Sequence, residues 1–139
     1  MNSPKSSSEL VYEILGAYQQ GDEQKLRSLM HPDAEVHGAP GLINAGTYYG
    51  YEGFREWLQQ WDDAWDEIDY ELREIIEVDD DIVVAPVHTV GIGAVSGLRI
   101  DAVFGWLYEW QDGRSRRFHV YPDVDSAIEA AKRIAAERV

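Results

Sequence analysis

The sequence contains no cysteine among its 139 residues. Disulfide bridges, thiolate metal sites and cysteine nucleophiles are therefore excluded, and the fold must be held together by packing. The sequence also lacks an apolar run near the roughly 20 residues that cross a bilayer, and its N-terminus lacks the basic-then-apolar pattern of a signal peptide. We therefore expect a cytoplasmic protein with one packed core, which is usual for a chain of this length.

Basic residues are also scarce, since 12 Lys and Arg stand against 26 Asp and Glu, for a formal net charge of -14. The segment 62–81 alone holds eleven acidic residues and a single basic one, Arg73. Such a surface repels phosphate backbones and anionic lipid, so we expect neither nucleic acid nor a membrane as a partner. A solvated face that aids solubility is the simpler explanation, and an acidic docking site for a basic partner is the alternative.

Aromatic residues gather in the segment 46–65, where a loop rich in Gly and Tyr leads into an amphipathic stretch. Large apolar side chains recur there at spacings of three and four, at Phe54, Trp57, Leu58, Trp61 and Trp65. This spacing predicts a helix with one aromatic face, and that face must lie against something apolar. Such a stripe beside such a loop is typical of the wall and mouth of a small-molecule pocket.

Capping signals predict the other helices. The first follows a polar tail over 1–7, begins at a capping box and ends at a glycine. A short second helix and a final helix over 127–138 each follow a capping aspartate. The residues that carry these signals are Ser6 with Glu9, Gly21, Asp22, and either Asp123 or Asp125.

Alternation of apolar and polar residues predicts strands over 68–78, 98–110 and 114–121, besides a short strand at 34–37. In 98–110 the face carrying Phe104, Trp106 and Tyr108 is expected to point inward. Asp112-Gly113 is a strong hairpin signal. We predict one α+β domain over 8–139, with its helices gathered on one face of a curved antiparallel sheet.

The stretch 82–92 is apolar on both faces, which is typical of a central strand or of a strand buried in an oligomer. Pro86 has no backbone N–H, so a bulge or a sheet edge is expected there. Val83, Ala85 and Val87 are expected to point away from the helices. Together they favour a homodimer.

The following segments, in this order, form a recognisable set: Gly21-Asp22, 31–37, 46–53, Trp61 with Trp65, 111–114 and Tyr121-Pro122-Asp123. The set resembles the SnoaL-like branch of the nuclear transport factor 2-like superfamily, over nearly the whole chain. The resemblance implies a cone-shaped α+β fold, in which a bent sheet wraps around helices and encloses a pocket, with an extra helix at the C-terminus. It also implies a homodimer through the outer sheet face.

Members of this superfamily include ketosteroid isomerases, polyketide cyclases, dehydratases and epoxide hydrolases, so the fold does not give the function. The catalytic tyrosine and two acids of ketosteroid isomerases fall on Ile14, Gly38 and Trp106. Enolisation needs a base and oxyanion donors, so steroid isomerase activity is disfavoured. Epoxide hydrolases use an Asp-Arg-Asp cluster, but Arg99 and Asp101 are expected on the strand face opposite Trp106.

SnoaL-type cyclases rely on an acid or base in the pocket, and the candidates for that role are His88, His119 and Asp123. His88 lies in an apolar strand and could titrate near physiological pH, or could be a hydrogen-bonded structural histidine. Asp123 follows Pro122 and precedes a helix, so a cap is the better interpretation.

The role expected of His119 depends on which face of the last strand points inward. If His119 and Tyr121 face the cone, His119 is the best candidate for a general base. If Phe118 and Val120 face the cone, His119 is a surface histidine. The sequence leaves both orientations open.

The expected ligand contacts are aromatic, and core packing is the alternative for each. They are Tyr18, Tyr48, Tyr49, Trp57, Trp61, Phe104, Trp106, Tyr108 and Tyr121. We expect no metal and no other cofactor, because the four histidines form no chelating pair on a common face.

Two hypotheses follow. The first is an aromatic-lined pocket for a small hydrophobic molecule, in a cofactor-free isomerase, cyclase or dehydratase. The second is a non-catalytic ligand-binding or dimerisation module whose cavity is small or filled by side chains. They differ in whether a titratable group faces an open cavity.

Overall fold

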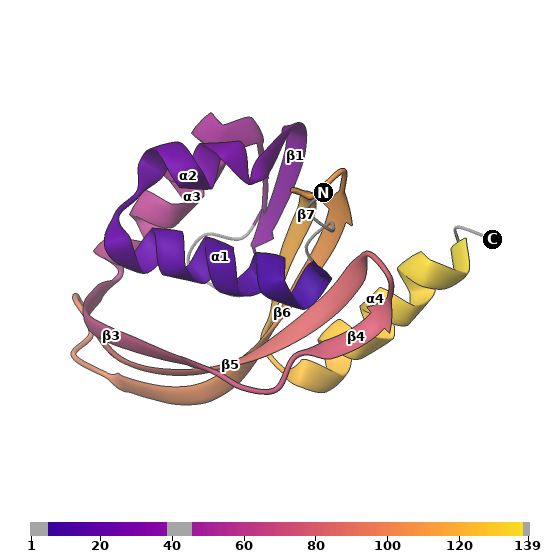
Figure 1. The fold of residues 1–139 in the computed structure, drawn as a ribbon. Coiled ribbons are helices and arrows are strands. Elements are labelled where there is room, and N and C mark those ends of the chain that lie inside the picture. The colour runs from indigo at the N-terminus through magenta and orange to yellow at the C-terminus, as the bar shows by residue number, and fades with distance from the viewer. Residues whose placement is uncertain (1–5, 39–45, 138–139) are drawn as a thin grey trace.

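The computed structural model describes residues 6–38 and 46–137. Within these residues the chain forms four helices and a curved, unclosed sheet of seven strands (Figure 1). The helices are α1 Ser7–Gln20, α2 Glu23–Ser28, α3 Gly50–Asp63 and α4 Val124–Glu137. The strands are β1 Met30–Gly38, β2 Gly46–Tyr49, β3 Trp65–Leu72, β4 Ile76–Asp79, β5 Ile82–Gly93, β6 Arg99–Gln111 and β7 Arg114–Tyr121. The expected cone-shaped α+β fold is confirmed.

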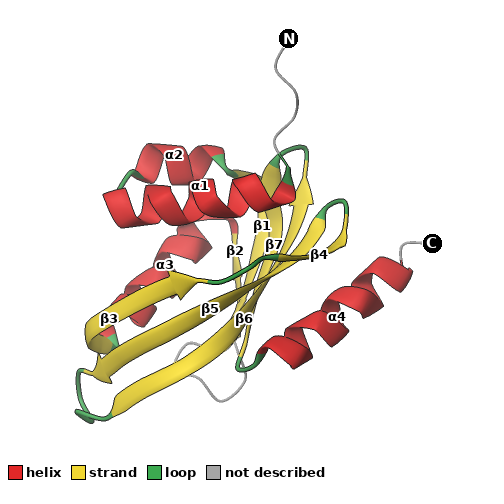
Figure 2. Ribbon diagram, turned by 60° about the horizontal axis from the view of Figure 1, so that its bottom comes forward, coloured by secondary structure: helices red, strands yellow, loops and turns green. Residues whose placement is uncertain are grey.

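The sheet has the order β2-β1-β7-β6-β5-β3, and β4 also pairs with β5. All pairs are antiparallel except β1 with β7, so the sheet is mixed. Helices α1, α2 and α3 lie on the inner face, whereas α4 crosses the outer face (Figure 2). The prediction that the helices gather on one face is therefore wrong for α4. An alanine-rich stripe of α4, at Ala127, Ala130 and Ala131, packs on the outer face.

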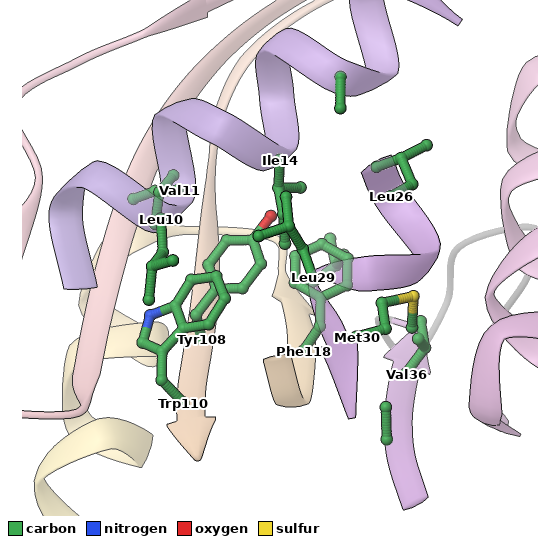
Figure 3. Packing of buried hydrophobic residues seen from close by; sticks show 14 of the residues in the cluster. Leu10, Val11, Ile14, Leu26, Leu29, Met30, Val36, Tyr108, Trp110 and Phe118 are labelled. Carbon is green, nitrogen blue, oxygen red and sulfur yellow. The ribbon is translucent and has the colours of Figure 1, made fainter. Parts of the chain in front are cut away.

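The two faces of the sheet belong to two separate apolar clusters. The larger cluster joins α1, α2 and α3 to the inner face (Figure 3). The smaller one joins α4 to Ile82, Val84 and Leu107 on the outer face. The first half of β5 is covered on both sides, because Val83, Ala85 and Val87 lie in the inner cluster and α4 covers Ile82 and Val84.

The expected direction of Val83, Ala85 and Val87 is wrong. All three side chains are fully buried in the inner cluster together with α1, so they point toward the helices. A homodimer does not follow from these residues. The outward set of β5 begins with Ile82 and Val84, which α4 covers.

The predicted helix caps are confirmed. The Ser6 hydroxyl accepts the backbone N–H of Glu9 at 3.2 Å, and Gly21 closes α1 with a φ of 69°. Asp22 accepts the N–H of Lys25 at 3.1 Å, and Asp123 accepts that of Ser126 at 2.7 Å. Because α1 begins at Ser7, the helix includes the last residue of the expected tail, and residues 1–5 of that tail lie outside the described residues.

The aromatic helix ends two residues before the last position that its periodicity predicts, Trp65. Helix α3 ends at Asp63, and Trp65 is the first residue of β3. The Trp65 ring still meets the Trp61 ring edge to face, with centroids 5.6 Å apart. The aromatic stripe therefore continues across a junction between helix and strand.

Three strand predictions need comment. Strand β1 is longer than the expected 34–37, because it pairs with β2 on one side and β7 on the other. The expected strand over 68–78 is split into β3 and β4 opposite Pro86, whose carbonyl accepts the backbone N–H of Arg73 at 2.9 Å. The Asp112-Gly113 hairpin is confirmed, and both residues have positive φ values of 54° and 74°.

Candidate functional site

An apolar cavity lies between α1, α3 and the inner face of the sheet. Its lining residues are all aliphatic or aromatic: Ile14, Leu15 and Tyr18 of α1, Phe54, Trp57, Leu58 and Trp61 of α3, Tyr70 of β3, Trp106 and Tyr108 of β6, and Phe118 of β7. The cavity volume is about 40 Å³. That is room for about three water molecules, so side chains largely fill the space.

The aromatic rings form a continuous wall around this cavity. Trp57 stacks on Trp61 with centroids 5.9 Å apart, and Phe118 meets Trp57 edge to face at 5.5 Å. Phe118 also meets Trp106 at 5.7 Å, and Trp106 meets Tyr70 at 5.8 Å. Edge-to-face and offset contacts of this kind add stability beyond the burial of area.

Polar groups gather at one rim of the cavity. The Tyr18 hydroxyl donates to the carboxylate of Asp62 at 2.8 Å, and the Trp61 indole N–H donates to the Tyr70 hydroxyl. Burial raises the pKa of Tyr18, with further contributions from Tyr70 and Asp62. Burial also raises the pKa of Tyr70 to about 12. Both phenols therefore stay protonated at physiological pH.

His88 does not reach this cavity. It lies on the outer face, where its Nε2 atom is 2.6 Å from the Asp101 carboxylate of the neighbouring strand. This hydrogen bond lowers the pKa of Asp101. Arg99 lies 4.0 Å from the same carboxylate, so both residues lie opposite Trp106, as the alternation predicts.

His119 also lies on the outer face, because Phe118 and Val120 occupy the inner cluster. Its ring is stacked on His37, with centroids 4.1 Å apart and planes within 2°. Its Nε2 atom is buried without a hydrogen-bond partner in the described part of the chain. Burial, then the nearby His37 and Arg117, lower its pKa to about 4, so the ring is neutral at physiological pH.

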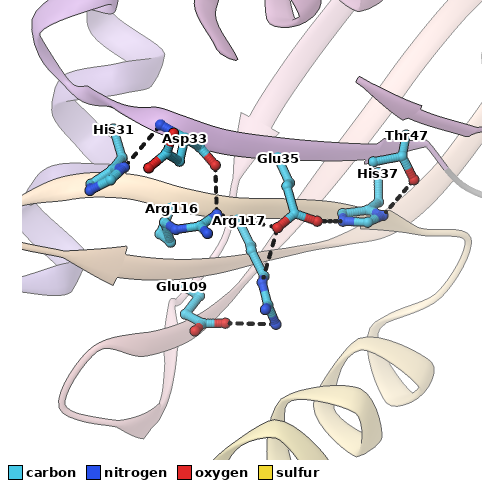
Figure 4. A network of polar contacts seen from close by, with 8 residues as sticks. All are labelled: His31, Asp33, Glu35, His37, Thr47, Glu109, Arg116 and Arg117. Carbon is cyan, nitrogen blue, oxygen red and sulfur yellow. Dashed lines mark hydrogen bonds and ion pairs between the residues drawn. The ribbon is translucent and has the colours of Figure 1, made fainter. Parts of the chain in front are cut away.

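An ion-pair network adjoins this stack through His37 (Figure 4). Glu35 of β1 is 3.2 Å from both His37 and Arg116 and 3.6 Å from Arg117, and Arg117 is 3.6 Å from Glu109 of β6. Burial works against the charge on Glu35, but hydrogen bonds from His37 and Arg116 lower its pKa overall. These five residues, Glu35, His37, Glu109, Arg116 and Arg117, join strands β1, β7 and β6.

The predicted ligand contacts divide into three groups. Five of them line the cavity: Tyr18, Trp57, Trp61, Trp106 and Tyr108. Phe104 is buried beside Trp61, with ring centroids 6.3 Å apart. The remaining three lie elsewhere: Tyr48 donates to Gln60, Tyr49 is 68% exposed, and Tyr121 packs in the outer cluster.

Sequence reasoning missed two residues of the rim, Tyr70 and Asp62. Tyr70 could have been found, because it belongs to the apolar set of the alternation that predicts β3. Asp62 carried no such signal, because the helical period places it on the polar side of α3. Its partner Tyr18 comes from another helix.

Across residues 6–38 and 46–137, no three His, Asp or Glu side chains converge in a way that could hold a metal ion. None of the helices in these ranges is both long and apolar enough to span a membrane.

Comparisons with known proteins support the fold. The family model for the SnoaL-like domain matches residues 11–118. A search of curated proteins gave no match.

Solved structures share the fold at low sequence identity. TerC, co-crystallised with polyporic acid, is 23% identical, covers 94% of this chain and 99% of its own, and has a TM-score of 0.73. An NTF2-like protein of unknown function from Burkholderia pseudomallei is 18% identical, with coverages of 90% and 96% and a TM-score of 0.75. IdmH from Streptomyces antibioticus, a candidate polyketide cyclase, is 18% identical, with coverages of 91% and 98% and a TM-score of 0.69.

Proposed function

This chain belongs to the SnoaL-like family, and we propose that it binds a small, largely apolar molecule in the aromatic cavity between α1 and α3. The observation that carries the proposal is the convergence of aromatic rings from α1, α3, β3, β6 and β7 on one space. Apolar walls with a few polar groups at one end are typical of ligand sites. The crystal structure of TerC with polyporic acid supports a small-molecule site in this fold.

A ligand must open the cavity, because a volume of about 40 Å³ is smaller than any aromatic molecule. Among the described residues, no backbone hydrogen bond joins α1 to α3. The two helices meet across the cavity through side chains, including half-buried Leu15 and Leu58. Movement of α1 away from α3 can therefore admit a ring without breaking the backbone ladder.

Binding is better supported than acid–base catalysis. Among the described residues, the cavity lining contains no histidine or carboxylate, and its titratable groups are tyrosines with raised pKa values. Such phenols are weak acids at neutral pH. A cofactor-free cyclase, isomerase or dehydratase would have to use the Tyr18–Asp62 pair, which is the one observation that favours that second function.

We also propose a homodimer through the part of the outer face that α4 leaves uncovered. Val90 and Ile92 lie on the same face of β5 as His88, Val103 of β6 is paired with His88, and Ile92 is among the exposed large apolar residues. Apolar side chains on an open sheet face favour a self-complementary contact. Val90→Glu should give a monomer in sedimentation velocity, whereas Glu71→Gln on the neighbouring strand should not.

Binding is tested by titrating the protein with polyporic acid and following tryptophan fluorescence and calorimetry. Trp106→Ala should raise Kd about tenfold or more, because it removes a ring from the cavity wall. Leu58→Trp should also weaken binding, since it fills the entrance without leaving a hole. Tyr12→Phe is the matched control, because Tyr12 lies on α1 but is 58% exposed. Equal affinities for all four proteins would sink the proposal. If Trp106→Ala abolishes the dimer and leaves ligand binding unchanged, the face of β6 that carries Trp106 would be the outer face and not the inner one.

A further inference from the structure

The hydroxyl of Tyr108 is a polar group of the aromatic cavity that the described part of the protein leaves without a partner. The Tyr108 side chain is only 4% exposed, and it lines the cavity between α1, α3 and the sheet. Its hydroxyl makes no hydrogen bond to any group in residues 6–38 and 46–137. Figure 3 shows the oxygen directed toward α1, on the side of Ile14, which lines the same cavity. The hydroxyl is therefore free to meet a molecule that enters the cavity.

The aromatic neighbours of Tyr108 hold this hydroxyl in place. The Tyr108 ring is stacked on Trp110, with centroids 5.1 Å apart and planes within 6°. Phe118 packs against the same ring, with centroids 4.8 Å apart. A ligand would therefore meet a group that is already positioned, without the loss of entropy that ordering a mobile side chain adds.

Tyr108 lies where the cavity leads toward a second, smaller hollow. This hollow has a volume of about 20 Å³, and Leu26 of α2 and Val36 of β1 also line it. Tyr18 and Tyr70 of the rim line the larger cavity and not this hollow. The two spaces share four lining residues: Ile14, Phe54, Tyr108 and Phe118. One end of a ligand can thus reach Tyr108 while its ring lies between the aromatic walls.

A buried hydroxyl without a hydrogen bond lowers stability, so its place in the wall needs an explanation. Burial raises the pKa of Tyr108, so the hydroxyl keeps its proton at physiological pH and can donate it. We propose that Tyr108 donates a hydrogen bond to an oxygen of the ligand, and that the cavity selects an aromatic molecule carrying an acceptor oxygen, such as a ketone, over a hydrocarbon of the same shape. This inference rests on the proposed binding function and names the ligand class for the same cavity.

The preference follows from what each kind of ligand gives up on entering. An oxygen that leaves water for an apolar cavity loses its hydrogen bonds, and a donor in the wall has to replace them. The Tyr18 hydroxyl at the rim already donates to Asp62 at 2.8 Å, whereas the Tyr108 hydroxyl is unengaged. A hydrocarbon loses no such bonds but leaves the Tyr108 hydroxyl unpaired. Tyr108 is therefore a specificity-determining residue that touches the ligand.

The experiment compares acetophenone with α-methylstyrene, in which a CH₂ group replaces the carbonyl oxygen and the shape is kept. Kd values come from NMR titrations that follow the indole N–H resonances of Trp57 and Trp61, which also locate binding at the cavity wall. Tyr108→Phe keeps the ring and removes only the hydroxyl. It should weaken acetophenone binding about tenfold and α-methylstyrene binding less than about twofold. The difference in hydrophobicity between the ligands is the same in both proteins, so the change in the Kd ratio isolates the hydrogen bond.

Two further variants and one stability measurement sharpen the test. Tyr12→Phe is the matched control, because Tyr12 is 58% exposed on α1, and it should leave the ratio unchanged. Tyr18→Phe tests the rim, and a change of the ratio there but not in Tyr108→Phe would overturn the inference. Without ligand, Tyr108→Phe should unfold at a temperature no lower than the unmodified chain does, because no internal hydrogen bond is lost. A clear fall would show that the hydroxyl has an internal partner, which would also overturn the inference.

The failure of this inference is distinguishable from the failure of the proposed function. If both ligands bind and Tyr108→Phe leaves the Kd ratio unchanged, Tyr108 does not select the ligand, and the binding function stands. If neither ligand shifts the indole resonances up to its solubility limit, the proposed function itself fails.

Discussion

The two faces of the sheet divide the chemistry of this protein between them. The inner face carries mainly aromatic and aliphatic side chains, and the polar groups at one rim of its cavity are two phenols, one indole and one carboxylate. His88 and His119 both lie on the outer face, where His88 pairs with the Asp101 carboxylate and His119 stacks on the His37 ring. The groups best suited to proton transfer thus help to hold the sheet together, and the cavity keeps groups suited to recognition.

Placing a polar residue on each face of the sheet is the most direct test of this difference between the two faces. Val83→Asn places an amide in the inner cluster, where the side chain is 0% exposed, and should lower the free energy of unfolding by about 3 kcal/mol. Val103→Asn, on the part of the outer face that α4 leaves uncovered, should cost under about 1 kcal/mol when it is measured in the monomeric Val90→Glu background, where the proposed dimer contact is absent. Urea denaturation followed by tryptophan fluorescence measures both. Equal losses would contradict the assignment of the faces.

The His119 stack should make the outer face sensitive to acid. The pKa of His119 falls from 6.5 to about 4 on folding, so the unfolded chain binds this proton first as the pH falls. Stability is therefore full above about pH 6.5 and is lost as the pH falls toward 4, by about 2 to 3 kcal/mol in total. The titratable and charged groups that face His119 are His37, Arg117 and Glu35.

His119→Phe keeps a ring on His37 and removes the titration. The free energy of unfolding, plotted against pH between 7 and 5, should then have a slope that is smaller by up to one bound proton. His88→Phe should keep the part of the slope that His119 contributes. Glu35, with its lowered pKa, contributes in the same direction but at lower pH, as its carboxylate is protonated. An unchanged slope in His119→Phe would show that the stack is open to solvent.

The contact between α4 and the outer face should be sensitive to one methyl group. A Cβ at Gly105 would lie 2.6 Å from the Ala127 Cβ and 2.9 Å from the Asp123 carbonyl oxygen. Gly105→Ala should therefore cost about 1 to 2 kcal/mol and speed amide exchange in α4, but not in α1. Gly16→Ala is the control, because nothing lies within 4 Å of its added Cβ and alanine favours the helix. Equal increases in amide exchange in α1 and α4 of Gly105→Ala would mean that packing on the outer face also affects the inner face.

The smallest expected effect concerns the rim. Tyr18→Phe removes the hydrogen bond to Asp62 and should cost about 1 kcal/mol, since the contact is partly open to solvent. Tyr12→Phe, on the exposed side of α1, should change stability by less than about 0.5 kcal/mol. Thermal unfolding measures both. A cost for Tyr18→Phe no larger than the control would show that the rim serves recognition and not stability.

Much of the fold could be predicted from the sequence because the signals are local. The caps at Ser6, Asp22 and Asp123 each join a side chain to a backbone group three residues away. The hairpin at Asp112-Gly113 needs two positive φ values in adjacent residues, which these residue types accept. The alternation in β6 also placed Trp106 and Tyr108 on the correct face, because a strand has a strict period of two.

The candidate site was less predictable, for an equally physical reason. In β7 one set of side chains includes Phe118 and Val120 and the other includes His119 and Tyr121. A cavity can accept polar as well as apolar groups, so the local pattern did not tell whether Phe118 or His119 faces inward. That orientation depends on the parallel pairing of β7 with β1, which aligns His119 with His37 and Phe118 with Val36. The rim likewise joins Tyr18 to Asp62 across 44 positions of the chain.

Periodicity and capping thus established which residues form each helix and strand and which aromatic rings share a face. Long-range pairing established the rest: that α4 covers the outer face, that Val83, Ala85 and Val87 point inward, and that both candidate histidines lie away from the cavity. A local pattern can show that a strand has two different faces, but which face becomes the inside depends on what packs against it.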